Sequence, residues 1–457
     1  MPGPCVPYTC ALIVAVALFW FGLSPFLNQK ATCKKTEATV DLQTDSLVLR
    51  YVPRDVYPGA RCLDGSDAGF FIRLAPPGSS CADDWVFFLQ GGGLCITPMD
   101  CWRRKDSDLG SSCHFLPEFR DKDGLLSTDE KNPFMNCNHV EIPYCSGDTH
   151  AGKGNGGKAG PWGLHFAGFV NVQSIMLHLR DTVMFYPTDS SKRAESLGLG
   201  GGGDGESGTT LEGIGAGPRR IVLAGGSAGG IGVALISDEI RDSVFRPSSG
   251  RFLMPSGGPL REESVLRQQF FGQLQSSEML AISQSGLFFP EGAHFGWLKG
   301  GPKFLSPRSF GHSVMSWAYS GAWSEGTVDW DVVGALRKTS VSTLVAVNIQ
   351  DTEATVAAMG PGGDWLEYKK ATVETARSLV DSGAPVSFFI PPCRSHTGTI
   401  CVGNNGTTVE GEGGEGVTYT EVVQEFIRGR RVVLVADEPF GLFGNASGTC
   451  KGGCSSQ

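Results

Sequence analysis

Short apolar runs alternate with longer amphipathic segments along most of this chain. The short runs are rich in aromatic and β-branched residues, which is typical of buried strands, whereas the longer segments carry apolar residues at helical spacing. The predicted strands are residues 85–90, 139–144, 220–224, 341–349 and 385–390, and the predicted helices are residues 166–185, 231–241, 372–381 and 419–428. This alternation predicts an α/β fold with a mostly parallel central sheet and helices on both faces.

The ends and two glycine-rich stretches depart from this pattern. Residues 9–27 form an apolar run without a charge, which indicates a signal peptide or a signal anchor, with a buried core helix as the alternative. Residues 197–217 predict a flexible Gly-rich insertion, and residues 403–416 a second Gly/Glu-rich loop. The predicted organisation is an N-terminal segment (1–29), a stem (30–44), one α/β domain (45–436) and a Cys-containing tail (437–457).

Composition narrows the class of protein. At 457 residues and 40% hydrophobic residues, the chain can bury a large core and is not disordered. Its net charge of −9 and pI near 5.5 argue against a nucleic-acid partner, which requires a basic face. Nothing in the composition indicates an oligomeric state.

Cysteine usage indicates an oxidising compartment. Twelve of the 14 cysteines lie from Cys33 onward, and seven of them crowd between Cys62 and Cys145. We expect disulfides on the loops and a secreted or type II membrane-anchored protein. A zinc site is disfavoured, because the chain has no CxxC pair and no H-x₃₋₅-H spacing. Asn405 and Asn445 lie in N-x-S/T tripeptides and are predicted glycosylation sites.

Residues 225–229 (GGSAG) fit G-x-S-x-G between a predicted strand and a predicted helix. A sharp turn there presents a serine side chain above the sheet, and the following helix N-terminus offers N–H groups to an oxyanion. Ser227 is therefore the candidate nucleophile, and the N–H of Ala228 a candidate oxyanion donor. The alternative is an ordinary glycine-rich turn in a chain with 64 glycines.

A serine hydroxyl needs a base, normally a histidine that a carboxylate orients. His396 is the only histidine after His312, and Asp351 precedes it just past a predicted strand. The two residues complete the order Ser, acid, His that is typical of α/β-hydrolases. A solvated surface histidine is the alternative for His396, and the following carboxylates compete with Asp351 on spacing alone: Glu353, Asp364, Glu367 and Asp381.

The glycines at residues 91–93 follow a predicted strand and are similar to the HGGG-type loop of lipases, which supplies an oxyanion donor. A glycine turn without a ligand is the alternative. Phosphate binding is disfavoured, since neither a G-x-G-x-x-G segment in a βαβ unit nor a P-loop lysine is present.

Several of these segments together resemble the pectin acetylesterase family, which includes the Notum carboxylesterases. The resemblance spans about residues 45–430 and is more specific than G-x-S-x-G alone. The segments that carry it are residues 88–95 (FLQGGGLC), Asn132-Pro-Phe134, residues 143–148 (PYCSGD), 223–230 (LAGGSAGG), 347–351 (VNIQD) and 393–396 (CRSH).

The resemblance implies an α/β-hydrolase-like core and a serine hydrolase that needs no metal or organic cofactor. It implies the triad Ser227, Asp351 and His396, with the N–H groups of Gly92, Gly93 and Ala228 as the oxyanion hole. Two positions depart from the family: its glutamate is replaced by Gln90 and its tryptophan by Leu94, which leaves the choice of substrate open.

The expected activity is hydrolysis of O-acetyl esters on an extracellular or luminal polysaccharide or glycoconjugate. The alternatives are removal of a lipid acyl group from a secreted protein, and a non-catalytic carbohydrate-binding protein on the same scaffold. A binding protein need not keep Ser227, Asp351 and His396, so the presence of all three favours an enzyme.

Overall fold

The computed structural model describes residues 46–95, 98–119, 124–154, 163–184, 217–246, 277–288, 290, 331–359, 364–398, 400–404, 407–410, 415–436, 439–440, 444–445 and 448–450. The predicted N-terminal segment and the stem lie outside these ranges, as do nearly all of the Gly-rich insertion and Asn405. Asn445 lies in a short strand, β14 (Gly444–Asn445). No helix in the described ranges has the length and apolar character needed to cross a membrane.

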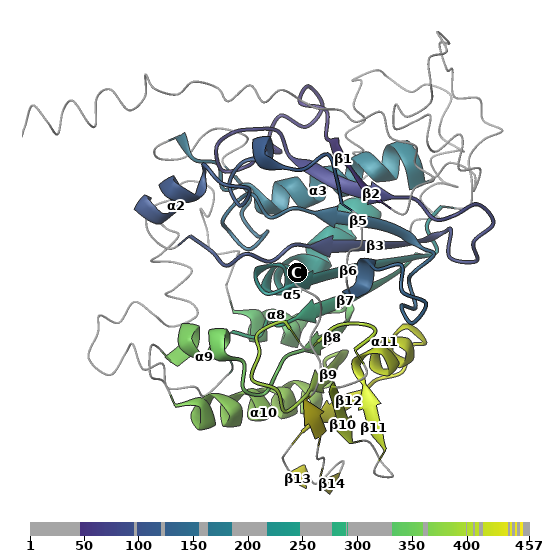
Figure 1. The fold of residues 1–457 in the computed structure, drawn as a ribbon, viewed down its shortest axis with the longest axis vertical. Helices are drawn as coiled ribbons and strands as arrows, with labels where there is room; N and C mark the ends of the chain where they lie inside the picture. The colour runs from purple at the N-terminus through teal and green to yellow at the C-terminus, as the bar shows by residue number, and fades with distance from the viewer. Residues whose placement is uncertain are drawn as a thin grey trace, which may run out of the picture.

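A ten-stranded sheet forms the centre of the molecule (Figure 1). Its strands are β1 (Leu47–Tyr51), β2 (Gly69–Arg73), β3 (Asp84–Leu89), β4 (Glu118–Phe119), β5 (Asn138–Ile142), β6 (Arg220–Gly226), β7 (Glu278–Gln284), β8 (Ser342–Ala346), β9 (Val386–Ile390) and β12 (Val433–Val435). The order across the sheet is β12-β9-β8-β7-β6-β3-β5-β2-β1-β4. The strands from β12 to β5 are parallel, and β2, β1 and β4 extend the sheet in antiparallel pairing.

Helices cover both faces of the sheet. They are α2 (Pro98–Arg104), α3 (Gly168–Leu179), α5 (Ala228–Ile240), α8 (Val332–Lys338), α9 (Thr352–Met359), α10 (Trp365–Asp381) and α11 (Tyr419–Ile427). Wider helical turns, η5 (Arg180–Met184) and η7 (Arg241–Phe245), continue α3 and α5, and short 3-10 turns occur at Ser112–His114 and Gly124–Leu126.

Side chains alternate between the two faces along each central strand. On β3, Trp85 and Phe87 pack with α3 and α5, whereas Val86 packs on the opposite face in the cluster that includes α11. A third apolar cluster joins α5, α8 and α10 to β8 and β9. Each fully buried side chain of this size contributes about 1.5–3 kcal/mol. The predicted fold is therefore confirmed: an α/β protein with a mostly parallel sheet and helices on both faces.

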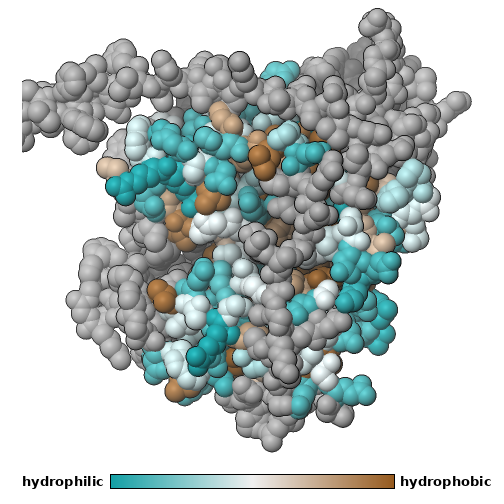
Figure 2. All heavy atoms as spheres, in the orientation of Figure 1, coloured by the Kyte–Doolittle hydropathy of each residue, from teal (hydrophilic) through white to brown (hydrophobic). Residues whose placement is uncertain are grey.

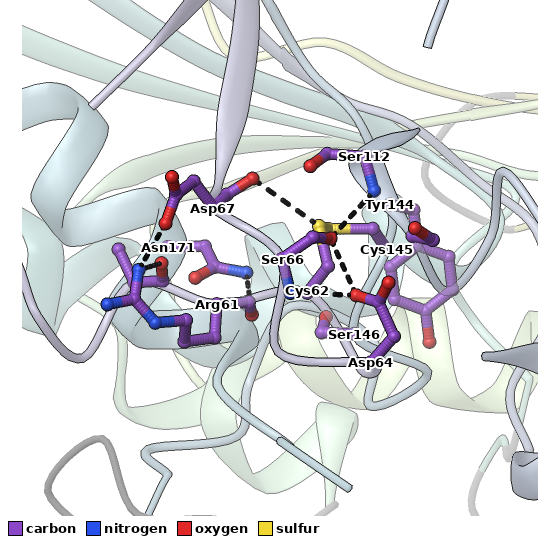
Figure 3. Close-up of a disulfide and its surroundings, with 12 residues drawn as sticks. Arg61, Cys62, Asp64, Ser66, Asp67, Ser112, Tyr144, Cys145, Ser146 and Asn171 are labelled. Atoms are coloured by element: carbon purple, nitrogen blue, oxygen red, sulfur yellow. Dashed lines mark hydrogen bonds and ion pairs between the residues drawn. A yellow bond between two sulfur atoms is a disulfide. The ribbon is translucent and has the colours of Figure 1, made fainter. Parts of the chain in front are cut away.

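Disulfides hold the loops at the β3 and β5 side of the sheet. The described part of the chain contains the disulfides Cys62–Cys145, Cys81–Cys137 and Cys95–Cys101. Cys113, Cys393 and Cys401 also take part in disulfides. Figure 3 shows how the Cys62–Cys145 bond ties the loop that carries Arg61 and Asp67 to the segment that starts at Tyr144. The prediction of disulfide-bearing loops is confirmed.

The structure differs from the sequence prediction at several elements. The helix expected from residue 231 begins at Ala228, directly after Ser227. Its first turn contains glycines, which have a low helix propensity, but the close packing at this turn requires them. The helix expected from residue 372 begins at Trp365, where the side chain of Asp364 caps it through the N–H of Leu366 at 2.9 Å. The strand β7 went unpredicted, although all its residues after Glu278 are buried.

The prediction that residues 403–416 form a Gly/Glu-rich loop was wrong at Thr407–Glu410. This stretch contains the strand β10 (Thr407–Glu410), which pairs with β11 (Gly416–Thr418) and β15 (Gly448–Cys450). The sequence TTVE has the alternation of a half-buried strand, since Thr407 and Val409 are buried between more exposed neighbours. The surrounding glycines hid this short pattern.

Candidate active site

The sequence-predicted site residues meet at the carboxyl ends of neighbouring parallel strands, which is where open α/β sheets place their ligands. The glycine loop at residues 91–93 follows β3, Ser227 follows β6, Asp351 follows β8 and His396 follows β9. The strands β3, β6, β7, β8 and β9 lie next to one another in that order in the sheet. Segments as far apart as residues 91 and 396 are thereby brought to one edge.

Ser227 occupies a strained turn between β6 and α5. Its φ of 53° and ψ of −118° lie in a region that residues with a side chain rarely adopt. Two glycines allow the turn: a Cβ on Gly225 would come within 2.5 Å of Gly229 O, and a Cβ on Gly229 within 2.0 Å of Leu89 O. The backbone is held further, because Ser227 N–H donates to Gln284 O at 2.8 Å.

Ser227, His396 and Asp351 form one continuous chain of hydrogen bonds. His396 Nε2 lies 2.7 Å from Ser227 Oγ, and His396 Nδ1 lies 2.7 Å from Asp351 Oδ2. Asp351 is fully buried, so it accepts the Nδ1–H of the imidazole and leaves Nε2 free to accept the Ser227 hydroxyl proton. The second Asp351 oxygen accepts the N–H of Ala354 at 2.8 Å.

The charges around His396 favour its protonated form. Burial lowers the pKa of His396, but the hydrogen bond and charge of Asp351, together with the nearby Glu353, outweigh burial and raise the pKa above 6.5. Glu353 Oε2 lies 3.7 Å from His396 Nε2, and its side chain is 69% exposed. Burial also raises the pKa of Asp351, against the hydrogen bonds it accepts from His396 and Ala354. An imidazole poised in this way can take a proton from Ser227 and return it to a leaving group.

The loop that carries His396 is held by side chains from the segments that follow β7 and β8. Ser285, in a left-handed conformation with φ of 49°, donates its hydroxyl to the backbone oxygen of His396. Asn348 donates to Ser395 O at 2.6 Å, and the ring of Phe288 stands edge-on to the imidazole at 5.3 Å. Sequence reasoning missed these residues, because no local pattern links them to His396.

The glycine loop that carries two of the predicted oxyanion donors, Gly92 and Gly93, passes the nucleophile at Gly91. A Cβ on Gly91 would come within 3.1 Å of Ser227 Cβ, so the glycine loop passes directly against the serine. Gly92 and Gly93 both have positive φ, and a Cβ on Gly93 would meet nothing within 4 Å, so space is open beside it. Ala228 is the first residue of α5, and its N–H has no partner inside the helix.

The two departures from the family pattern also border this loop. The side chain of Gln90 accepts the Tyr144 N–H at 3.0 Å, and the Gln90 carbonyl accepts a hydrogen bond from His150 Nε2 at 2.9 Å. Burial lowers the pKa of His150 to about 4, so the imidazole is neutral at neutral pH. Leu94 is half-buried at the end of the loop. Gln90 thus anchors the glycine loop from behind.

Metal ligands are scarce in the described part of the chain. The one cluster of metal-binding side chains there consists of Cys81, Asp84 and Cys137. Because Cys81 and Cys137 are joined in a disulfide, neither offers a thiolate to a metal.

Exposed apolar side chains occur on the helices next to the site. Met99 and Trp102 are exposed on α2, which follows the glycine loop, and Val356 is exposed on α9, which follows Asp351. Figure 2 shows apolar atoms in small groups among polar ones on this face of the molecule.

Comparisons with known proteins point to one family. Residues 41–192 match the family described as Pectinacetylesterase. Palmitoleoyl-protein carboxylesterase NOTUM of Drosophila melanogaster is 33% identical over 190 residues, which cover 40% of this chain and 23% of that protein. Pectin acetylesterase 4 of Arabidopsis thaliana is 32% identical over 166 residues, covering 35% of this chain and 38% of that protein. Pectin acetylesterase 5 is 29% identical over 195 residues, covering 42% and 44%.

These matches span less than half the length of the curated relatives. The predicted resemblance is confirmed as a distant homology. The segment that matches the family contains the glycine loop but ends before Ser227. The geometry of Ser227, His396 and Asp351 is therefore an observation independent of that match.

Proposed function

We propose that this distant homologue of the pectin acetylesterases and Notum carboxylesterases is a carboxylic ester hydrolase with Ser227 as its nucleophile. The observation that carries the proposal is the hydrogen-bonded chain from Ser227 Oγ through the His396 imidazole to Asp351 Oδ2, with 2.7 Å at both steps. If Ser227 merely lay in an ordinary glycine turn, nothing would require these three side chains to be aligned.

The proposed reaction uses each group in turn. His396 Nε2 takes the hydroxyl proton as Ser227 Oγ attacks the ester carbonyl, and Asp351 stabilises the imidazolium. The N–H groups of Gly92, Gly93 and Ala228 stabilise the negative oxygen of the tetrahedral intermediate. The C–O bond to the alcohol then breaks, and His396 returns its proton to the leaving oxygen. Water, deprotonated by His396, then attacks the acyl-enzyme. The acyl bond to Ser227 Oγ breaks, His396 returns the proton to Ser227 Oγ, and the acid is released. Every step uses side chains and backbone of this chain.

For the substrate, we propose O-acetyl esters on an acylated polysaccharide or glycoconjugate. The similarity to pectin acetylesterases supports this choice. The similarity to palmitoleoyl-protein carboxylesterases supports a second candidate, a lipid acyl ester on a secreted protein. The two candidates differ in acyl chain length and therefore in the depth of apolar pocket that each requires.

The proposal includes a place in the secretory pathway. The described disulfides support it, because such bonds persist in oxidising compartments. Anchoring by residues 9–27, glycosylation at Asn405 and Asn445, and the domain boundaries remain predictions from the sequence.

The test is hydrolysis of p-nitrophenyl acetate and p-nitrophenyl octanoate by the purified chain and by Ser227→Ala. We expect the wild type to turn over at least one ester, and the variant to lose about 10⁴-fold or more in kcat. A preference for acetate favours the polysaccharide substrate, and a preference for octanoate favours the lipid acyl group. If wild type and variant are both folded and equally inert, the esterase proposal fails, and the alternative of a non-catalytic binding protein is favoured.

A further inference from the structure

We propose that Arg104 is a positioning residue of the oxyanion hole, which it controls through the peptide bond between Gly92 and Gly93. This inference rests on the proposed function, since it assigns a residue behind the same site. Arg104 lies at the end of α2, and its guanidinium donates from Nη2 to Gly92 O at 2.8 Å and from Nε to Leu109 O at 3.1 Å.

The bond to Gly92 O fixes the direction of a neighbouring donor. In a trans peptide the N–H points opposite to the C=O. With the Gly92 carbonyl directed at Arg104, the Gly93 N–H points to the other side of the loop. A Cβ on Gly93 would meet nothing within 4 Å, so the space at that side of Gly93 is open. Gly93 is one of the predicted oxyanion donors.

The charge of Arg104 acts on the same peptide. Within the described part of the chain no carboxylate forms an ion pair with Arg104, and its guanidinium lies over the ring of Tyr144 at 4.9 Å from the centroid. A hydrogen bond from a cation polarises the accepting carbonyl, and this makes the N–H of that peptide a stronger donor. Arg104 therefore fixes the orientation of the Gly93 N–H and makes it a stronger hydrogen-bond donor.

The surroundings hold Arg104 in this pose. The Cys95–Cys101 disulfide links the end of the glycine loop to α2, the helix that carries Arg104. On the opposite side, Tyr144 is fully buried, and the adjacent Cys145 is fixed by its disulfide to Cys62 (Figure 3). The glycine loop, α2 and the Tyr144 ring are thus held together behind the predicted oxyanion hole.

The test compares Arg104→Met, which keeps the apolar stem, with Arg104→Lys, which keeps a charge but loses the planar fork. Arg103→Met is the matched control, because Arg103 is exposed on the same helix. The measurements are kcat and KM for p-nitrophenyl acetate, and the inhibition constant of a trifluoromethyl ketone, which forms a tetrahedral adduct with an active serine. Melting temperatures are recorded for all four proteins.

We expect Arg104→Met to lower kcat by about 10²-fold, towards the loss seen when one oxyanion donor is removed, with little change in KM. Its affinity for the trifluoromethyl ketone should fall by a similar factor. Arg104→Lys should recover part of both losses, and Arg103→Met should match the wild type.

Wild-type kcat and inhibitor affinity in a folded Arg104→Met would overturn the inference while leaving the esterase proposal intact. If Arg104→Met does not fold, Arg104→Lys decides: a reduced kcat with a matching loss of inhibitor affinity supports the inference, and wild-type values overturn it. An inert wild type contradicts the proposed function itself, which is a separate outcome.

Discussion

The turn that carries Ser227 and the loop that carries His396 reach the same site by different physical means. Ser227 is placed mainly by its neighbours in sequence, since Gly225 and Gly229 let the strand, the helix and the backbone of β3 approach closely, and one remote group, Gln284 O, accepts its N–H. His396 is fixed by side chains from elsewhere in the chain, through Ser285 and Asn348. The serine turn is determined largely by five consecutive residues, 225–229, whereas the histidine loop depends on the completed fold.

This difference separates two kinds of sensitivity. Steric changes at the serine turn should act on stability, because backbone atoms cannot move away without disrupting the sheet. Polar changes around the histidine loop should act on activity first, because a small displacement of the imidazole weakens proton transfer.

The largest expected effect is on the acid that orients His396. Asp351→Asn should lower kcat by about 10⁴-fold, since an amide cannot hold the imidazole tautomer or stabilise its charge. Asp364→Asn is the matched control, because asparagine caps a helix as well as aspartate does. Steady-state kinetics with an activated ester measures both. Equal losses in the two variants would contradict the assignment of Asp351.

A pair of glycine substitutions tests the comparison itself. Gly229→Ala places a Cβ within 2.0 Å of Leu89 O and should cost more than about 3 kcal/mol or prevent folding. Gly398→Ala, in the histidine loop, meets only ordinary contacts at 3.8–3.9 Å and should change stability by less than about 0.5 kcal/mol. Urea denaturation measures both variants. Similar stabilities would remove the distinction between the two regions.

The histidine loop is tested by removing one remote contact. Ser285→Ala should lower kcat/KM by about tenfold to a hundredfold, because the His396 backbone loses its hydrogen bond and the imidazole shifts. Ser382→Ala, which removes a local bond to Leu379 O far from the site, should leave kcat/KM unchanged. A Ser285→Ala enzyme with wild-type kinetics would show that the loop holds its shape without Ser285.

The smallest expected effect is a shift in pH dependence. His396 must be neutral to act as base, so kcat/KM should rise with pH through the raised pKa of His396, with a midpoint above 6.5. Glu353→Gln removes one of the charges that raise this pKa, so the midpoint should move to lower pH. Because Glu353 is largely exposed, the shift should shrink as salt is added. A shift to higher pH would contradict the role given to Glu353.

The sequence predicted the parts of the molecule that local patterns determine. The five predicted strands and the turn at Ser227 rest on short apolar runs and on glycine spacing, and the structure contains each of them. The helix from Gly168 and the helix from Tyr419 were also found within a few residues of their predicted bounds.

Contacts between residues far apart in the sequence could not be predicted from local patterns. Spacing alone left Asp351 and Glu353 open as the acid, and the structure places them at different nitrogens of the same imidazole. Arg104 was not among the predicted site residues, since its contact with Gly92 joins residues 12 positions apart in the sequence. The strand β10 was hidden by glycines on both sides. Each of these features is determined by tertiary packing and leaves no periodic pattern in the local sequence.

Covalent labelling of Ser227 tests the central claim most directly. The purified chain is treated with a fluorophosphonate, digested and mapped by mass spectrometry, with His396→Ala in parallel. We expect one adduct, on the peptide that contains Ser227, and a much slower reaction in His396→Ala, because only an activated serine attacks the phosphonate. No adduct on the folded wild type, or a Ser227 adduct that forms equally fast without His396, would contradict the assignment of Ser227 as an activated nucleophile.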